Sequence, residues 1–176
     1  MTWSRRQWLG VTATSLGAAA AGAAFHQWWR LGTPASTVPL QQISLPDLEG
    51  RPQALGQWRN KLLVLNFWAT WCEPCRDEIP ALVKAQEKHA KRVQIVGISV
   101  DSADKIREFI PPFKINYPLL LADLGTLQWM KDLGNRSGGL PYTVFITDAQ
   151  KVVHQHLGAL TLAELEAAFE KWQNPA

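Results

Sequence analysis

Cysteine is scarce in this sequence, whose 176 residues contain only two, Cys72 and Cys75. One bond between them would close a very short loop and remove little entropy from the unfolded chain, which excludes a disulfide framework as the source of stability. Two cysteines also exclude a structural zinc site with four cysteine ligands. What remains is chemistry between two thiols separated by two residues.

An excess of charge of either sign is also lacking in the body of the chain. The whole sequence has 18 Lys and Arg against 15 Asp and Glu, but Arg5, Arg6 and Arg30 lie within the first thirty residues. Without these three, the part from Leu31 onward has 15 basic and 15 acidic residues. A neutral body offers no basic surface to phosphates, so we expect no nucleic-acid partner.

Several common catalytic patterns are absent as well. The sequence has no glycine-rich phosphate loop, no Ser/His/Asp grouping and no Asp/Glu cluster suited to a metal ion. With 47% hydrophobic and 19% charged residues, the chain has enough apolar material for one domain with a sizeable core. We therefore expect a single folded domain without a resident cofactor or metal.

Residues 1–31 are predicted to be an export signal or a membrane anchor. Two arginines precede residues 7–25, a stretch without charge that is rich in Ala and Gly. The sequence SRRQWLG at 4–10 resembles the twin-arginine signal, with Trp where Phe is usual and Gly where Lys is usual. An uncharged run of this length could also span a bilayer without that export route. In both cases we expect the protein in the periplasm or on the outer face of the cytoplasmic membrane.

The end of this leader allows two outcomes. Small residues at 21–24 offer a cleavage site, whereas Trp28 and Trp29 resemble the aromatic belt of an uncleaved anchor that contacts the membrane. Residues 32–39 then have the composition of a linker. The folded domain is predicted to occupy residues 40–176.

Within that domain, short apolar runs alternate with amphipathic stretches. Strands are predicted at 62–68, 93–100 and 117–121, and an antiparallel hairpin at 142–147 and 152–157. Helices are predicted at 73–90, about 102–110 with Asp101 and Ser102 as caps, 124–133 and 161–172. This order is typical of an α/β sandwich with a mixed central sheet.

The two cysteines lie where the first predicted strand gives way to a helix. A helix N-terminus carries partial positive charge and free N–H groups, which favour a thiolate at Cys72. Cys75 lies one turn into the helix and can reach back, and Pro74 fits the first turn because it needs no donor there. The pattern predicts a redox pair in which Cys72 attacks and Cys75 resolves. A structural disulfide and half of a metal site are the alternatives.

Two motifs in this order resemble the TlpA/ResA-type branch of the thioredoxin-like superfamily. They are NFWATWCEPCR at 66–76, followed by EIP at 78–80, and GLPYTVFI at 139–146. The resemblance extends over about residues 40–172 and implies a thioredoxin-like fold. It also implies an exported or membrane-anchored disulfide reductase that serves client proteins, for example in cytochrome c maturation. A membrane thiol donor of the DsbD/CcdA type would then restore its dithiol.

The resemblance assigns roles to residues around the cysteines. Pro141 is implied to be a cis-proline beside the pair, and Leu140 to expose backbone groups with which a client strand can pair. Trp71 is expected in the client-binding rim. Ordinary thioredoxins have a buried Asp at the position of Asn66, which cannot titrate. The acid of this branch maps instead onto Glu78.

Glu78 could take the proton of Cys75, because residues three apart are neighbours on a helix. The alternative is a solvated acid that the helix dipole favours in the first turn. Glu73, between the cysteines, opposes thiolate formation by like charge and so favours a reducing pair. Two other functions stay open: a copper chaperone that adds His154 or His156 to the cysteines, and an oxidising disulfide catalyst.

Overall fold

The computed structural model describes residues 39–172. The predicted export signal at 1–31 and nearly all of the predicted linker lie outside the described residues. Across the described range, no helix is long and apolar enough to cross a membrane.

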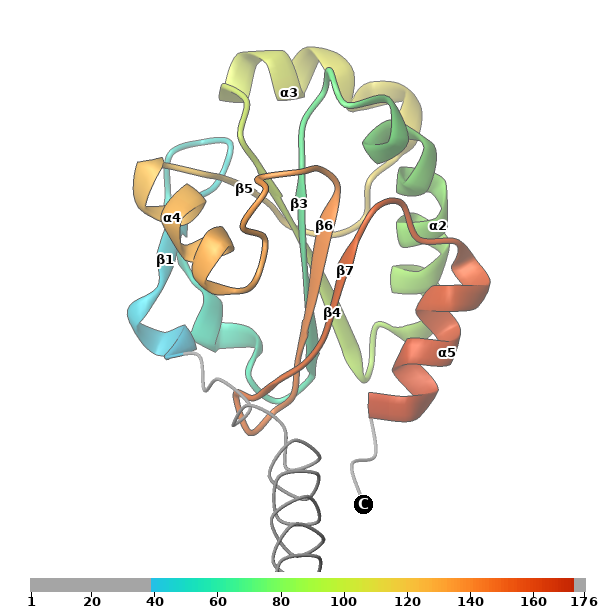
Figure 1. Ribbon diagram of the computed structural model, residues 1–176. Coiled ribbons are helices and arrows are strands. Elements are labelled where there is room, and N and C mark those ends of the chain that lie inside the picture. Colours follow the sequence, from blue (N-terminus) through green and yellow to red (C-terminus); the bar gives the residue numbers. More distant parts are fainter. Residues whose placement is uncertain (1–38, 173–176) are drawn as a thin grey trace, which may run out of the picture. The chain divides into compact units, whose positions relative to one another are not determined.

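A five-stranded mixed sheet forms the centre of the domain, as predicted (Figure 1). Its strand order is β5-β4-β3-β6-β7. The strands are β3 (Leu62–Trp68), β4 (Val93–Ser99), β5 (Leu119–Leu121), β6 (Tyr142–Ile146) and β7 (Val152–Leu157). Strands β3, β4 and β5 are parallel, whereas β6 and β7 run antiparallel to their neighbours. Each differs by at most two residues at either end from the predicted range.

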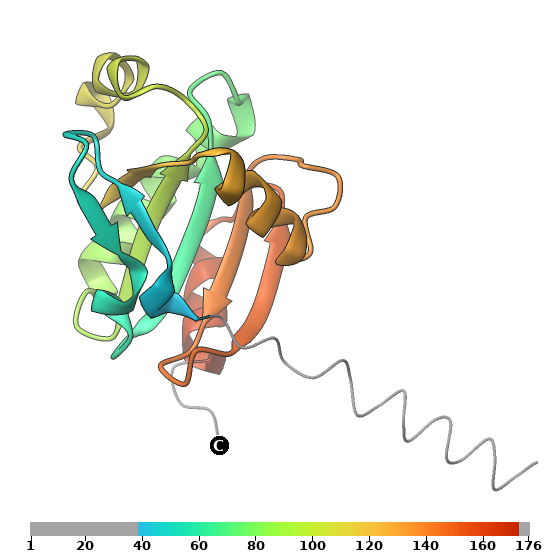
Figure 2. The same ribbon diagram turned by 90° about the vertical axis from the view of Figure 1, so that its left-hand side faces the viewer.

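Helices cover both faces of this sheet (Figure 2). They are α2 (Glu73–His89), α3 (Ala103–Phe109), α4 (Leu124–Asp132) and α5 (Leu162–Trp172). Successive side chains of a strand point to opposite faces, so Val64 packs into the core that includes residues of α2 and α5, and Leu65 packs into the core on the side of α4. All seven residues of β3 are buried, as expected for a strand that is covered on both faces.

A small hairpin precedes the main sheet and was not predicted. It pairs β1 (Ser44–Pro46) with β2 (Pro52–Ala54) between two short 3₁₀ helices, η1 (Leu40–Gln42) and η2 (Leu55–Trp58). These strands, SLP and PQA, are short, each contains a proline and neither has an apolar run, so the sequence does not indicate them.

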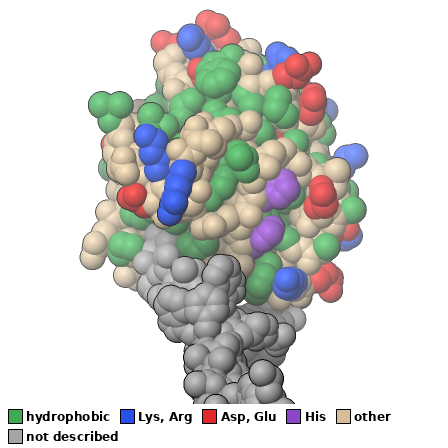
Figure 3. Space-filling model, viewed as in Figure 1, with side chains coloured by type: hydrophobic (Ala, Val, Ile, Leu, Met, Phe, Trp, Pro, Cys, Tyr) green, Lys and Arg blue, Asp and Glu red, His purple; other side chains and the backbone are tan. Residues whose placement is uncertain are grey.

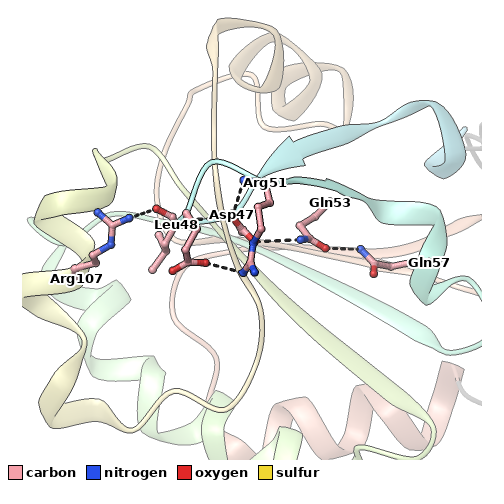
Figure 4. Close-up of polar contacts among 7 residues, drawn as sticks. Asp47, Leu48, Arg51, Gln53, Gln57 and Arg107 are labelled. Atoms are coloured by element: carbon pink, nitrogen blue, oxygen red, sulfur yellow. Dashed lines mark hydrogen bonds and ion pairs between the residues drawn. The ribbon is translucent and has the colours of Figure 1, made fainter.

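Asp47 organises the turn of this hairpin (Figure 4). Its Oδ1 accepts hydrogen bonds from the backbone N–H groups of Glu49 and Arg51 at 3.0 and 2.9 Å. Its Oδ2 accepts from Arg51 Nε at 2.9 Å and from Gln53 Nε2 at 3.1 Å. The guanidinium of Arg107 on α3 also donates to the carbonyl of Leu48, so the hairpin is tied to the helix beside it.

The chain enters the domain at the end of the strands where β6 ends. The backbone N–H of Leu40 donates to Oε1 of Gln150 at 3.2 Å, and Gln150 lies in the turn between β6 and β7. The two cysteines follow the opposite end of the strands, where β3 ends and β6 begins.

One predicted helix cap differs in the structure. Ser102 occupies the N-cap position of α3, but its side chain makes no capping hydrogen bond. Asp101 instead accepts a hydrogen bond from the backbone N–H of Thr70 through Oδ2, at 2.6 Å. This bond joins the segment after β4 to the segment that leads into the cysteine pair.

Candidate active site

The cysteine pair occupies the junction of β3 and α2, as the sequence predicts. Cys72 is the N-cap residue of α2, and its Sγ accepts a hydrogen bond from the backbone N–H of Cys75 at 3.3 Å. The two residues form a disulfide with an S–S distance of 2.09 Å and a Cα–Cα distance of 5.3 Å. Pro74 lies in the first turn, where its missing N–H costs no hydrogen bond.

The two sulfur-bearing side chains are not equally accessible. Cys72 is 6% exposed and Cys75 is fully buried, whereas the preceding Trp71 is 68% exposed. An incoming disulfide can therefore reach Cys72 but not Cys75. The helix N-terminus stabilises a thiolate at the same sulfur.

Glu78 is buried one turn after Cys75, with only 2% of its surface exposed. Its Oε1 accepts a hydrogen bond from Nδ2 of Asn66 at 2.7 Å, and its Oε2 accepts from the backbone N–H of Leu160 at 3.0 Å. Burial raises the pKa of Glu78 to about 7, although both hydrogen bonds act in the opposite direction. The alternative of a solvated first-turn acid is therefore wrong.

Two partners in this buried polar cluster were not found from the sequence. Thr143 Oγ1 accepts a hydrogen bond from Asn66 Nδ2 at 3.1 Å, and the two residues face each other on β3 and β6. Thr143 stands two residues after Pro141 in the quoted motif, so the strand register could have pointed to it. The N–H of Leu160 lies in the loop before α5. It is a backbone group, so the identity of the residue does not reveal its role.

Leu140 and Pro141 directly precede β6, at the same end of the strands as the cysteines. The peptide bond between them is cis, and Phe67 near the end of β3 pairs with Tyr142 at the start of β6. The Pro141 carbonyl accepts a hydrogen bond from the N–H of Gly158 at 2.9 Å. Within residues 39–172, the N–H and C=O groups of Leu140 take part in no backbone hydrogen bond.

An exposed apolar side chain lies beside this loop as well. Leu157, the last residue of β7, is 54% exposed. Its Cδ1 is only 3.1 Å from the point where a Cβ on Gly139 would stand, so it packs against the segment that leads into Leu140. Leu157 was not predicted as a site residue, because an apolar residue at the end of a strand does not reveal that it is exposed.

Three histidines, His89, His154 and His156, lie within the described residues. His154 and His156 lie on β7 with ring centroids 6.5 Å apart, and Figure 3 shows histidine side chains close together on the surface. The ring of His89 packs edge-on against Phe169 of α5, with centroids 5.2 Å apart. Among residues 39–172, no group of three or more His, Cys, Asp or Glu side chains could hold a metal ion.

A redox disulfide at the start of a helix, together with a cis-proline directly before a strand of the mixed sheet, defines a class of protein: the thiol-disulfide oxidoreductases with a thioredoxin-like fold. The sequence model of the Redoxin family matches residues 33–169, and the chain belongs to this family.

Similar proteins agree with this class. The chain is 33% identical over 134 residues to the thioredoxin-like protein YneN of Bacillus subtilis, which covers 73% of this chain and 75% of the relative. It is 32% identical over 128 residues to the thiol-disulfide oxidoreductase ResA of Bacillus cereus, which covers 71% of each. A solved thiol:disulfide interchange protein from Chlorobium tepidum superposes with a TM-score of 0.71 at 25% identity, over 81% of this chain and all of that chain.

Proposed function

We propose that this protein works outside the cytoplasm as a reductase of disulfides in client proteins. One observation carries the proposal: an accessible Cys72 and a fully buried Cys75 lie at a helix start, and the buried acid Glu78 follows one turn later. The arrangement provides an attacking sulfur, a resolving sulfur and a base. The extracytoplasmic location rests on the twin-arginine-like sequence at 4–10.

The reaction begins with the reduced pair. The thiolate of Cys72 attacks one sulfur of the client disulfide, forms a mixed disulfide and expels the other client sulfur as a thiolate. Cys75 then gives its proton to Glu78, and the resulting thiolate attacks Sγ of Cys72. The bond between Cys72 and the client breaks, and the second client sulfur leaves. Two electrons pass from the cysteine pair to the client.

The acidity of Glu78 suits this step. A base works best when its pKa lies near the working pH, and burial brings the pKa of Glu78 to about 7. Its neutral carboxyl form can later return the proton to a sulfur when the pair is reduced again. We propose that a membrane thiol donor of the DsbD/CcdA type supplies the electrons for that step.

The proposed client site is the surface around Cys72. The backbone groups of Leu140, which make no backbone hydrogen bond within residues 39–172, can pair with an extended client segment. Trp71, next to Cys72 in the chain, and Leu157 offer exposed apolar surface. Contacts to backbone groups and to apolar side chains fit a client with an extended chain next to its disulfide.

The direction of electron flow follows from the residues between the cysteines. Glu73 is exposed there and opposes the negative charge of a Cys72 thiolate, which makes the reduced pair less stable and the protein more reducing. We expect a reduction potential closer to thioredoxin, at about −270 mV, than to the oxidant DsbA, at about −120 mV. Equilibration of the domain with dithiol and glutathione buffers measures it. A potential near that of DsbA would instead identify an oxidising catalyst.

A further inference from the structure

We propose that Asn66, with its amide held by Thr143, is a positioning residue that fixes the carboxylate of Glu78 and sets the pH range in which it accepts the proton of Cys75. The inference rests on the proposed role of Glu78 as the base. It assigns a role to Asn66, whose position is occupied by an acid in ordinary thioredoxins.

Only one orientation of the Asn66 amide uses both of its N–H hydrogens in hydrogen bonds. Its Nδ2 carries two hydrogens, and two acceptors lie within reach: Glu78 Oε1 at 2.7 Å and Thr143 Oγ1 at 3.1 Å. Asn66 and Thr143 are 2% and 0% exposed, so bulk water does not compete for these atoms. The nitrogen of the amide, rather than its oxygen, therefore faces Glu78.

This orientation favours one protonation state of the acid. An N–H donor stabilises a carboxylate, whereas the amide oxygen would stabilise only a protonated carboxyl that donates to it. If the amide turned around, its oxygen would face both groups, the Thr143 hydroxyl would have to donate instead of accept, and Glu78 would hold its proton more strongly. The Thr143 hydroxyl therefore helps to keep Glu78 ionisable despite its burial.

Two further groups within residues 39–172 interact with Glu78, and both are uncharged. Leu160 contributes a backbone N–H to the second carboxylate oxygen, and Tyr117 is a buried phenol whose pKa is raised by burial and by the charge of Glu78. Cys75 lies one turn earlier on α2. Within the described part of the chain, no Lys, Arg or His makes a hydrogen bond or an ion pair with Glu78. Neutral donors therefore provide the stabilisation that a cation often provides elsewhere.

The test is a direct titration of the Glu78 carboxyl by carbon NMR in the oxidised protein, where the cysteines do not titrate. In Asn66→Ala we expect its midpoint to rise by about one to two pH units, the usual effect of losing one hydrogen bond to a buried charge. Thr143→Val keeps the shape of the side chain but removes the acceptor of one Asn66 amide hydrogen, and should raise the Glu78 midpoint by a smaller amount. Thr143→Ser keeps the hydroxyl and should leave the midpoint unchanged. Midpoints that stay at the parent value in both Asn66→Ala and Thr143→Val would overturn the role of Asn66.

A second measurement separates this proposal from the role of Glu78 itself. The pH profile of mixed-disulfide release is recorded in rapid mixing for the parent and for Thr143→Val, the variant with the smaller risk to folding. We expect the profile to move to higher pH by the same amount as the Glu78 midpoint. A midpoint that moves while the profile stays in place would overturn the assignment of Glu78 as the base.

Discussion

The backbone N–H of Leu160 donates a hydrogen bond to Oε2 of Glu78, across 82 positions of sequence, at 3.0 Å. The bond joins the first turns of α2 to the loop that precedes α5. It is one of only two hydrogen bonds that the Glu78 carboxylate makes within the described residues, and it brings a distant loop into the proposed reaction centre.

Glu78 should make stability depend on pH. Its pKa is raised from 4.5 to about 7, so between these values the folded protein holds a proton that the unfolded chain releases. The contribution of this group to the free energy of unfolding is therefore largest below pH 4.5 and falls as the pH rises to 7, by about 3 kcal/mol. The stability of Glu78→Gln relative to the parent should rise by this amount from pH 4 to pH 8. Denaturant unfolding of both oxidised proteins measures it, and parallel curves would contradict the burial of a titrating acid.

The same substitution should slow the second half of the reaction. Because Glu78 is buried, bulk water is a poor substitute for the carboxylate, and we expect release of the client to slow by about 10²-fold. Formation of the mixed disulfide by Cys72 should stay close to the parent rate. Rapid mixing resolves the two steps, and equal release rates across pH 6 to 9 would exclude Glu78 from proton transfer.

Replacement of each cysteine should give opposite results. Cys72→Ser removes the accessible sulfur and should abolish disulfide reduction. Cys75→Ser leaves a Cys72 that attacks but cannot release the client, so covalent adducts should accumulate on non-reducing gels. Adducts that form with Cys72→Ser instead would reverse the two roles.

Leu157 should contribute to client binding. Leu157→Asp places a charge beside the Leu140 segment and should raise KM for a protein client several-fold, with little effect on a small disulfide such as oxidised glutathione. Leu124 at the start of α4 is 87% exposed and follows the edge strand β5, at the other side of the sheet, so Leu124→Asp is the matched control. Equal losses in both variants would argue that any added surface charge has this effect.

The leader permits a prediction of its own, based on the sequence. Arg5→Lys combined with Arg6→Lys should stop export if SRRQWLG at 4–10 is a twin-arginine signal. Cell fractionation followed by immunoblotting measures the result. Unchanged delivery of the double variant would indicate the general secretory route.

The sequence predicted the elements that carry strong periodic patterns. The run at 62–68 is continuously apolar, and the strand β3 it predicts lies at the centre of the sheet. The placement of Cys72 at the helix start followed from the same pattern. The hairpin of β1 and β2 escaped prediction because its short strands, SLP and PQA, each contain a proline and lack the apolar run that marks the equally short β5, LLL.

The depth of Glu78 could not be predicted in the same way. Spacing along a helix gives the direction of a side chain relative to Cys75, but not what covers it. The cover comes from Asn66 on β3 and from the backbone at Leu160, which are brought together only by the complete fold. A first-turn acid favoured by the helix dipole and a buried base have the same sequence signature.

The hydrogen bond between Leu40 and Gln150 shows at which end of the strands the chain enters the domain. The polypeptide joins the domain at one end of the sheet, and the disulfide lies at the other end. Five residues of β6 separate the two ends, a length of about 17 Å. Whatever is fused ahead of Leu40, whether a natural leader or an engineered tag, is attached at the end remote from Cys72. An immobilised form of this domain should therefore be coupled through its N-terminal side, which leaves the reactive end free to meet large clients.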